Sequence, residues 1–268
     1  MIAPAPAGRY GWAMLNTISH GSATAEPPLL IAHGLFGSGR NWGVIAKRLS
    51  DERQVIAADM RNHAHSPWFD SHGYPDLAGD LAEVIEEIGQ PVDVMGHSMG
   101  GKAAMTLALT RPDLVNRLIV ADIAPVAYDH TQSHNIAAMR QVDLSTVEKR
   151  SDATAQLLPH LEDPDLAPFL LQSLDLSPKR WRLNLDVLDR EMEKILSFPD
   201  LPGHFAGPVL FLSGGESSYV TQAHRPRIKT LFPDARFMKI PGAGHWLHAE
   251  KPREFEAAVR GWLNRPAA

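Results

Sequence analysis

A single serine, Ser98, stands among glycines at positions 96, 100 and 101 in the stretch VDVMGHSMGGKAAMTLAL, residues 92–109. A serine hydroxyl is a poor nucleophile, so a serine that attacks an ester must be exposed where a base can remove its proton. A strand that turns abruptly into a helix places the serine at its apex with strained backbone angles, and glycines on either side prevent collisions within the turn. The spacing therefore predicts a nucleophilic serine at a strand-to-helix turn.

A second glycine-containing loop, HGLFGSGRNW, follows the apolar run LLIA about 60 residues before the serine. A strand that ends at His33 and Gly34 and turns through Leu35 and Phe36 can direct a backbone N–H toward a reacting carbonyl. The residue after the nucleophile supplies the other N–H. We therefore predict that Leu35 and Met99 form an oxyanion hole.

The general base must be one of thirteen histidines. His245 lies in PGAGHW, after the last apolar strand and before the final amphipathic helix. A glycine-rich loop at that place can lower its ring onto the serine, and a histidine that follows the serine in the chain satisfies the order of nucleophile, acid and histidine. We therefore predict His245 as the base.

The other histidines have simpler interpretations. His97 adjoins the serine, and its side chain is expected to leave the apex on the other side. His63 and His65 are interpreted as residues of a surface loop. His130 and His134 are four residues apart, but without an associated carboxylate motif a pocket rim is favoured over a metal site.

Apolar runs alternate with helical patterns after the Ala- and Pro-rich first residues, which indicates an α/β protein with a mostly parallel sheet. Short apolar runs bounded by Gly, Pro or Asp are typical of strands buried on both faces. The expected strands are 13–19, 29–32, 54–58, 92–95, 117–121, 209–212 and 235–240. The expected helices are 40–50, 76–89, 98–110, 221–232 and 251–264.

This alternation lapses at residues 125–205, where helical periodicity continues without a convincing strand. Prolines divide this segment into short helices, and the leucine-rich faces of these helices must pack against another apolar surface. We expect the faces to bury against the main domain and to line part of an apolar pocket over the serine. The predicted organisation is a core formed by residues 1–124 and 206–268 with a helical cap formed by residues 125–205.

The composition and net charge of the chain limit the classes of protein to which it can belong. The chain has 268 residues, is 44% hydrophobic and carries a formal net charge of −5, so it can bury a sizeable core and gives no electrostatic reason to expect nucleic acid as a partner. Its longest basic run, residues 179–182, is interpreted as a solvated helix face. It has no cysteine, no run of 18 apolar residues and no signal-peptide pattern at the N-terminus, and we expect a cytoplasmic protein without a membrane span.

Five stretches, HGLFGSGRNW, ADMRNHAHS, GHSMGG, ADIAPV and PGAGHWLH, occur in the order and spacing of the α/β-hydrolase superfamily. Within it the chain resembles the carboxylesterase group of abhydrolase-domain esterases, and the resemblance covers essentially everything after residue 10. It implies an eight-stranded sheet with helices on both faces, a helical cap inserted after the sixth strand, and catalysis by Ser98 and His245 without a cofactor.

The acid of the triad departs from the commonest pattern of the superfamily, which has an aspartate just after the seventh strand. That place holds Ser217 here, and Glu216 is one residue out of register. Asp122 ends the sixth strand beside the nucleophile strand, where some α/β hydrolases, including the group resembled here, place their acid. Asp186 is a third candidate, on a cap helix. Asp122 is the predicted acid, and Glu216 and Asp186 stay open as alternatives.

The predicted function is hydrolysis of carboxylic esters through an acyl-enzyme, with no metal and no cofactor. Asp59 and Arg61, in ADMRNHAHS, are expected to brace the loop near the oxyanion hole. The apolar cap favours a small-molecule ester with an apolar acyl group. Thioesters such as acyl-CoA, and cofactor-free lyase or perhydrolase chemistry on the same fold, remain alternatives, whereas a non-catalytic binding module would be expected to lack a triad residue. The sequence does not predict an oligomeric state.

Overall fold

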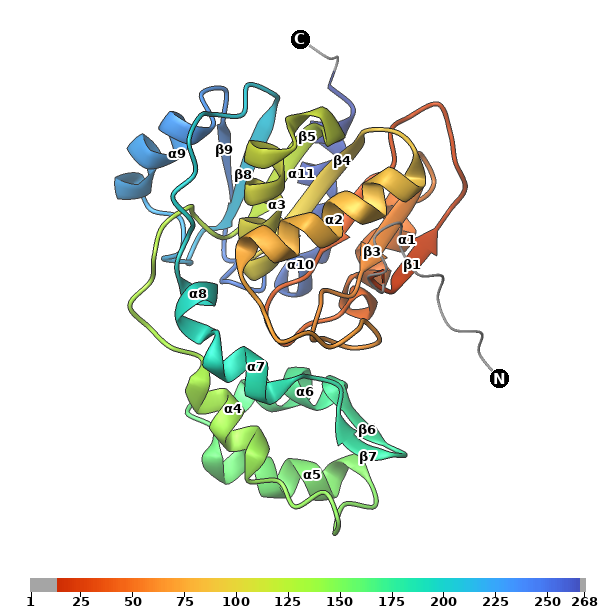
Figure 1. The fold of residues 1–268 in the computed structure, drawn as a ribbon, viewed down its shortest axis with the longest axis vertical. Helices are drawn as coiled ribbons and strands as arrows, with labels where there is room; N and C mark the ends of the chain where they lie inside the picture. Colours follow the sequence, from red (N-terminus) through yellow and green to blue (C-terminus); the bar gives the residue numbers. More distant parts are fainter. Residues whose placement is uncertain (1–13, 266–268) are drawn as a thin grey trace.

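The computed structural model describes residues 14–265, which contain a central seven-stranded sheet (Figure 1). In spatial order the strands are β1 (Thr17–His20), β3 (Val55–Ala58), β2 (Leu29–Ala32), β4 (Val92–His97), β5 (Val115–Ala121), β8 (Val209–Gly214) and β9 (Arg236–Ile240). β1 pairs antiparallel with β3, and the other neighbouring pairs are parallel. The predicted mostly parallel sheet is therefore observed. Within the described residues this central sheet has seven strands, one fewer than the resemblance implies, and Ala13 of the first predicted strand lies outside the described residues.

Both faces of the sheet are covered by helices, so its inner strands are buried on both sides. Leu30 and Ala32 of β2 belong to the apolar cluster on the α2 and α3 side, whereas Leu29 and Ile31 belong to the cluster on the α1 and α11 side. Alternation of this kind is what a strand between two helical layers requires. It explains why these strands read as continuous apolar runs in the sequence.

The helices that flank the sheet follow the predicted order (Figure 1). On one face lie α2 (Tyr74–Ile88), α3 (Met99–Thr110) and α9 (Arg225–Leu231), and on the other lie α1 (Gly43–Leu49), α10 (Leu247–Glu250) and α11 (Pro252–Leu263). Single 3₁₀ turns precede α1, β5 and α9, namely η1 (Gly39–Trp42), η2 (Pro112–Leu114) and η6 (Gln222–His224). α10 was not predicted because four residues are too few to show a helical period.

Residues 125–205 form a separate, mostly helical layer beyond one end of the sheet, drawn at the bottom of Figure 1. Its elements are α4 (Ser133–Arg140), α5 (Arg150–Leu157), η3 (Leu158–His160), η4 (Pro164–Leu166), α6 (Ala167–Leu170), η5 (Leu171–Ser173), β6 (Leu174–Leu176), β7 (Lys179–Trp181), α7 (Leu185–Arg190) and α8 (Met192–Leu196). The segment leaves the core after β5 and returns before β8, so it is an insertion between two neighbouring parallel strands.

Two expectations for this segment are wrong. It contains a small antiparallel hairpin, in which Leu174 pairs with Trp181 and Leu176 with Lys179, where no strand was expected. The basic run at 179–182 therefore begins in strand β7 and is not a helix face. Strands of three residues are too short to show a two-residue period, which is why the pattern was missed.

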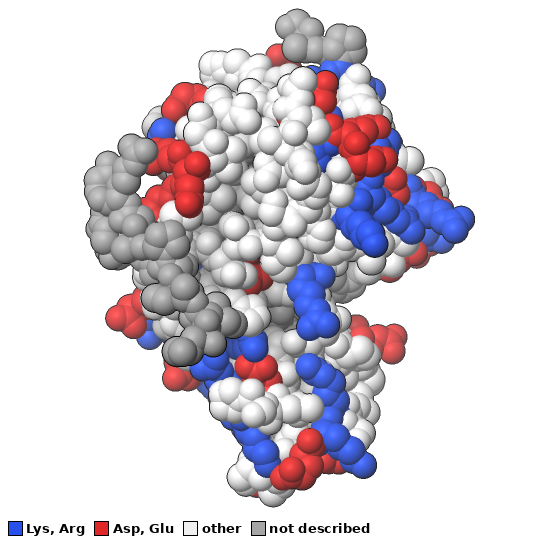
Figure 2. All heavy atoms as spheres, turned by 90° about the vertical axis from the view of Figure 1, so that its right-hand side faces the viewer, with Lys and Arg blue, Asp and Glu red and all other residues white. Residues whose placement is uncertain are grey.

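Basic and acidic side chains are interspersed on the face of the molecule drawn in Figure 2. Ion pairs such as Lys179 with Glu148 and Arg260 with Glu52 form between basic and acidic side chains of the described residues. The interspersed charge agrees with the slightly negative net charge of the chain. Within residues 14–265, no helix combines the length and the apolar character that a membrane crossing requires.

Candidate active site

Ser98 lies at the sharp turn between β4 and α3, as the glycine spacing predicts. Its backbone has φ 52° and ψ −120°, a strained conformation for a residue with a side chain. A Cβ on Gly96 would lie 2.2 Å from the carbonyl oxygen of Gly100, and a Cβ on Gly100 would lie 2.3 Å from the carbonyl oxygen of Ala32. The two glycines are therefore required because backbone atoms occupy the space that any side chain would need.

The loop after β2 passes close to the serine and carries Leu35. A Cβ on Gly34 would lie 3.2 Å from the Cβ of Ser98, which shows how near the two loops come. Met99 is the first residue of α3, where a backbone N–H has no partner within the helix. The backbone hydrogen bonds of residues 14–265 include none that Leu35 donates. Within the described residues, neither predicted donor N–H therefore has a backbone hydrogen-bond partner.

His245 lies in the loop between β9 and α10 and is 19% exposed. The Glu250 carboxylate accepts the N–H groups of Gly244 at 2.7 Å and Trp246 at 3.1 Å, so both neighbours of His245 are held in place. The imidazole stacks on the ring of Tyr219 with centroids 4.0 Å apart. The Nδ1 of His245 lies 2.8 Å from Oδ2 of Asp122, and both His245 and Ser98 line one pocket.

Asp122 is fully buried at the end of β5, and its carboxylate is surrounded by donors. Oδ1 accepts the Gly214 N–H at 3.0 Å, and Oδ2 accepts both the Ser217 hydroxyl and the His245 ring. Hydrogen bonds of this kind compensate a buried carboxylate for the loss of water around it. The arrangement gives His245 one defined orientation.

The other two carboxylates considered from the sequence lie elsewhere. Glu216 is exposed, and Asp186 is 87% exposed and forms an ion pair with Arg140 at 2.7 Å. Ser217, which occupies the place of the commonest acid, donates its hydroxyl to Asp122 instead. Ser217 therefore supports the carboxylate from the turn after β8, the place where other members of the superfamily carry the acid itself.

The orientation expected for His97 is wrong. Its ring does not point away from the site, because it lies 4.7 Å from the ring of His245 and lines the same pocket. Its Nε2 donates to the backbone carbonyl of His245 at 2.9 Å, so it supports the loop that carries the base. Burial holds the pKa of His97 well below its ordinary value, and the ring is therefore neutral.

His33 fixes the start of the loop that carries Leu35. Its Nε2 accepts the Met60 N–H at 2.9 Å, so the proton is on Nδ1, which donates to the Gly34 carbonyl at 2.7 Å. Burial lowers the pKa of His33 to about 4. The neutral ring therefore ties β2 to the residues that follow β3.

His63 braces the next part of that loop and is not a surface residue, contrary to expectation. It is fully buried, whereas His65 is exposed as expected. Its Nε2 accepts the Phe36 N–H at 3.2 Å and its Nδ1 donates to the Arg61 carbonyl at 2.8 Å. Burial, with a smaller effect of His33, lowers the pKa of His63 to about 3. The polar composition of ADMRNHAHS suggested exposure, and only contacts distant in sequence show that this loop is packed.

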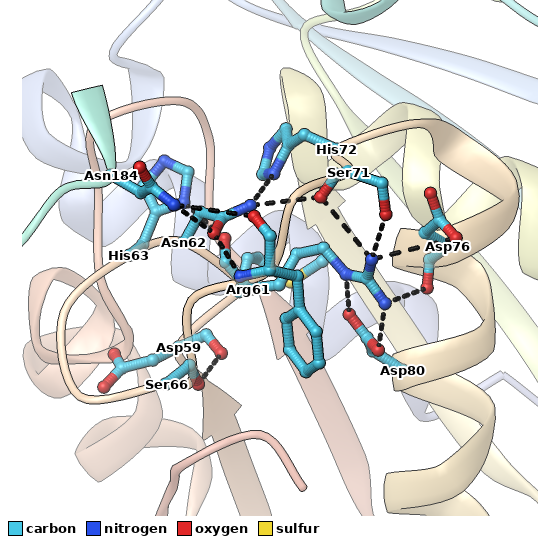
Figure 3. Close-up of polar contacts among 12 residues, drawn as sticks. Asp59, Arg61, Asn62, His63, Ser66, Ser71, His72, Asp76, Asp80 and Asn184 are labelled. Carbon is cyan, nitrogen blue, oxygen red and sulfur yellow. Dashed lines mark hydrogen bonds and ion pairs between the residues drawn. The ribbon is translucent and has the colours of Figure 1, made fainter. Parts of the chain in front are cut away.

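Asp59 and Arg61 tie the loop that follows β3 to two different parts of the core. Asp59 accepts the Gly39 N–H at 2.7 Å, and Arg61 forms a two-bond ion pair with Asp80 at 2.6 and 2.7 Å (Figure 3). Burial together with the two Asp80 hydrogen bonds makes Arg61 a structural partner of α2. Asp59 therefore contacts the segment expected from the sequence, whereas Arg61 holds the loop after β3 against α2.

His130 lines the pocket, and its Nε2 lies 2.9 Å from the Tyr219 hydroxyl. His134 instead approaches Glu162 at 3.9 Å and does not line the pocket. The rim position expected for both therefore applies to His130. Among the residues that the structure describes, no three His, Cys, Asp or Glu side chains are grouped as a metal site would require.

The pocket above Ser98 has a volume of about 240 Å³ and is mainly apolar. The inserted segment contributes Leu166, Phe169, Leu170 and Ile195 to its lining. This is the position expected for the apolar faces of that segment, and an apolar wall of this kind suits an aliphatic chain.

Lys102 also lines the pocket, and sequence reasoning missed it. It lies one helical turn after Ser98, is 1% exposed, and donates from Nζ to the carbonyls of Leu196 at 2.7 Å and Ser197 at 2.6 Å. Burial lowers the pKa of Lys102 to about 7. Its contacts tie the end of α8 to the nucleophile helix. The available signal was a lysine within the otherwise apolar helical stretch GGKAAMTLAL.

Comparison with known proteins gives consistent matches. The sequence profile of the alpha/beta hydrolase fold matches residues 27–252. The mouse (Mus musculus) sn-1-specific diacylglycerol lipase ABHD11 is 40% identical over 255 residues, covering 91% of this chain and 82% of that protein. Esterase YbfF of Escherichia coli strain K12 is 39% identical over 242 residues, covering 88% and 93%. The solved structure of a marine microorganism esterase is similar with a TM-score of 0.87 and 39% identity, covering 93% of this chain and 99% of that one.

Proposed function

The chain belongs to the α/β-hydrolase family and is an ester hydrolase, and from this premise we propose that Ser98, His245 and Asp122 are its catalytic triad. Membership confirms the fold class and the enzyme class expected from the sequence. We further propose that Leu35 and Met99 provide the oxyanion hole. The observation that carries the proposal is the 2.8 Å contact between His245 and a fully buried Asp122, in a pocket that also contains Ser98.

The proposed reaction begins with attack of the Ser98 hydroxyl oxygen on the ester carbonyl. Because Nδ1 of His245 faces Asp122, Nε2 is the atom that takes the serine proton. The carbonyl oxygen becomes an oxyanion, and the N–H groups of Leu35 and Met99 stabilise it. Collapse of this intermediate expels the alcohol, which leaves with the proton from Nε2, and forms an acyl-enzyme at Ser98.

The second half repeats these steps with water. Nε2 of His245 removes a proton from the water as its oxygen attacks the acyl carbonyl, and the oxyanion forms at the same two N–H groups. Return of the proton to the Ser98 oxygen releases the carboxylic acid and restores the enzyme. Asp122 accepts the hydrogen bond from Nδ1 of His245 throughout and stabilises the imidazolium that forms in each half.

We propose that the substrates are esters with an apolar acyl group and that residues 125–205 act as a cap over them. The apolar contributions of this segment to the pocket lining support the assignment, and residues 1–124 and 206–268 are then the catalytic core. The names of the relatives, a diacylglycerol lipase and esterases, agree with acyl esters as the substrate class. A thioester has the same reacting carbonyl and belongs in the test.

The test is a panel of aryl esters of increasing acyl length with matched thioesters, assayed on wild type and Ser98→Ala. We expect kcat/KM to rise with acyl length until the pocket is filled, and Ser98→Ala to lose about 10⁶-fold in kcat, as removal of a triad serine does elsewhere. Retention of wild-type turnover by a folded Ser98→Ala variant would overturn the proposal. Faster cleavage of every thioester than of its matched ester would replace the ester by the thioester as the preferred substrate.

A further inference from the structure

A short antiparallel contact joins the inserted segment to the core loop that follows β3. The Ala64 N–H donates to the Arg182 carbonyl at 2.7 Å, and the Asn184 N–H donates to the Asn62 carbonyl at 3.0 Å. We call these two segments, residues 62–64 and residues 182–184, the cap junction. Because the contact is made by backbone atoms, any change in the position of the inserted segment acts directly on the core loop.

The side-chain amide of Asn62 lies at the centre of this junction (Figure 3). Its Oδ1 accepts the Phe69 N–H at 2.8 Å and the Asn184 amide at 3.1 Å, and its Nδ2 donates to the Ser71 carbonyl at 3.1 Å and lies 3.3 Å from His72 Nδ1. An asparagine amide has two donors and two acceptor sites, so all of them are used. The residue is fully buried.

The backbone of Asn62 is also constrained. Its φ is 65°, in the left-handed region that asparagine enters more readily than most residues with a side chain. Ala64, two residues later in the junction, has φ 47°. Strained residues persist where the surrounding contacts determine their conformation, and they occur most often at functional sites.

From Asn62, two contacts lead to the proposed oxyanion hole. The next residue, His63, accepts the N–H of Phe36, which adjoins one oxyanion donor. His72, which the Asn62 amide contacts, approaches the sulfur of Met99 at 3.2 Å, and Met99 carries the other donor. Since Nδ1 of His72 faces the Asn62 amine, the ring proton is on Nε2 and points to the sulfur.

We propose that Asn62 is a positioning residue that couples the docking of the cap at Asn184 to the geometry of the oxyanion hole. The inference rests on the proposed function. Oxyanion donors act only when they lie about 2.7–3.1 Å from the developing charge, and a displacement of about 1 Å can cost 100-fold in rate. Loosening this junction should therefore reduce transition-state stabilisation more than substrate binding.

The first test variant is Asn62→Asp. Aspartate keeps the shape of the side chain and also tolerates a positive φ. It replaces both donors by an oxygen that faces the Ser71 carbonyl and the lone pair of His72, so the contact toward Met99 is lost. We expect kcat to fall by about 10- to 100-fold with KM changed by less than about threefold.

The second test variant is Asn184→Ala, which removes the cap side of the same contact. Its matched control is Asn116→Ala, which removes an exposed asparagine amide at the other end of the sheet, where it donates to the Pro91 carbonyl. We expect Asn184→Ala to lower kcat by about tenfold and the control to leave it unchanged. The double variant Asn62→Asp with Asn184→Ala should lose less than the product of the two single losses, because both act on one contact.

The deciding measurement is affinity for a trifluoromethyl ketone, which forms a tetrahedral oxyanion with Ser98, compared with the corresponding alcohol, which fills the pocket without forming one. We expect ketone affinity to fall in parallel with kcat, alcohol affinity to stay constant, and the pH profile of kcat/KM to keep its midpoint. Circular dichroism and thermal unfolding check the fold, and Asn184→Ala carries the test if Asn62→Asp does not fold.

Unchanged kcat and ketone affinity in folded variants would overturn the coupling, and so would equal losses of ketone and alcohol affinity. Failure of the proposed function would look different. In that case the ketone would not inhibit wild type and Ser98→Ala would retain activity. If the ketone inhibits wild type and the variants behave like wild type, only the role of Asn62 is refuted, and the proposed function stands.

Discussion

The carboxylate of Asp122 accepts hydrogen bonds from three different parts of the chain, namely the end of β8 at Gly214, the following turn at Ser217 and the loop at His245. Such partners compensate a buried carboxylate for the loss of its water shell. In a serine hydrolase this carboxylate orients the histidine and stabilises the imidazolium that forms during attack. Glu216, one residue before Ser217, has its side chain in solvent. Mutation of Asp122 and mutation of Glu216 are therefore expected to have very different effects on activity.

We expect Asp122→Asn to lower kcat by about 10⁴-fold, because the amide no longer stabilises the imidazolium or enforces the required tautomer of His245. The matched change Glu216→Gln should keep kcat within about tenfold of wild type, which corresponds to a barrier change below about 1.4 kcal/mol. Steady-state kinetics with one aryl ester, after unfolding curves have shown that both variants are folded, provides the comparison. A crippled Glu216→Gln with an active Asp122→Asn would place the acid after β8.

Sequence reasoning identified residues whose role follows from local spacing and missed those whose role follows from distant contacts. Ser98 was recognisable because glycines are required on either side of a tight turn. His63 and Lys102 were not, because a histidine in a polar loop and a lysine in a helix usually face solvent. Their burial depends on partners more than 20 residues away in the chain, Phe36 for His63 and Leu196 for Lys102.

At the scale of elements, β4, the turn at Ser98 and α3 form one rigid support for the nucleophile. The turn is closed by the Ser98 N–H, which donates to the Ala121 carbonyl of β5 at 3.0 Å, and by the approach of Gly100 to β2. The strands beside it were predictable because burial on both faces produces continuous apolar runs. The hairpin of β6 and β7 was not, since each strand has only three residues.

Two glycine-to-alanine changes test the close packing of this support. Gly100→Ala places a Cβ 2.3 Å from the carbonyl oxygen of Ala32, so backbone must shift, and we expect a loss of about 1–3 kcal/mol in the free energy of unfolding and a large loss of activity. Gly79→Ala, in the middle of α2, meets nothing within 4 Å, and we expect a gain of about 0.5–1 kcal/mol with activity unchanged. Urea unfolding of both variants measures these differences, and equal stability would contradict the packing described.

At the scale of the whole molecule, the stability should depend on pH through histidines buried as neutral rings. Burial lowers the pKa of His33 to about 4 and that of His63 and His248 to about 3, and it holds those of His72 and His97 well below the ordinary 6.5. Between these values and 6.5 the unfolded chain binds more protons than the folded one. The full contribution of these histidines to stability is therefore present above pH 6.5 and is lost as the pH falls toward about 4.

We accordingly expect the free energy of unfolding to fall between pH 6.5 and 4.5, with each of these histidines contributing up to about 1.4 kcal/mol per pH unit. Urea unfolding at half-unit steps of pH gives the slope and hence the number of protons taken up. His63→Gln should reduce that number by one. A free energy that is flat from pH 7 to pH 5 would mean that these rings are not buried as neutral bases.

The central claim is that Ser98 is the single activated nucleophile of an ester hydrolase, and its most direct test is reaction with a fluorophosphonate followed by mass spectrometry of the peptides. Attack by the serine oxygen expels fluoride and leaves a stable phosphonyl ester, so the label marks the nucleophile itself. We predict one label per chain, on the peptide that contains Ser98, with complete loss of ester hydrolysis and no label on Ser98→Ala. A label on another residue, or full inactivation without a label on Ser98, would contradict the account.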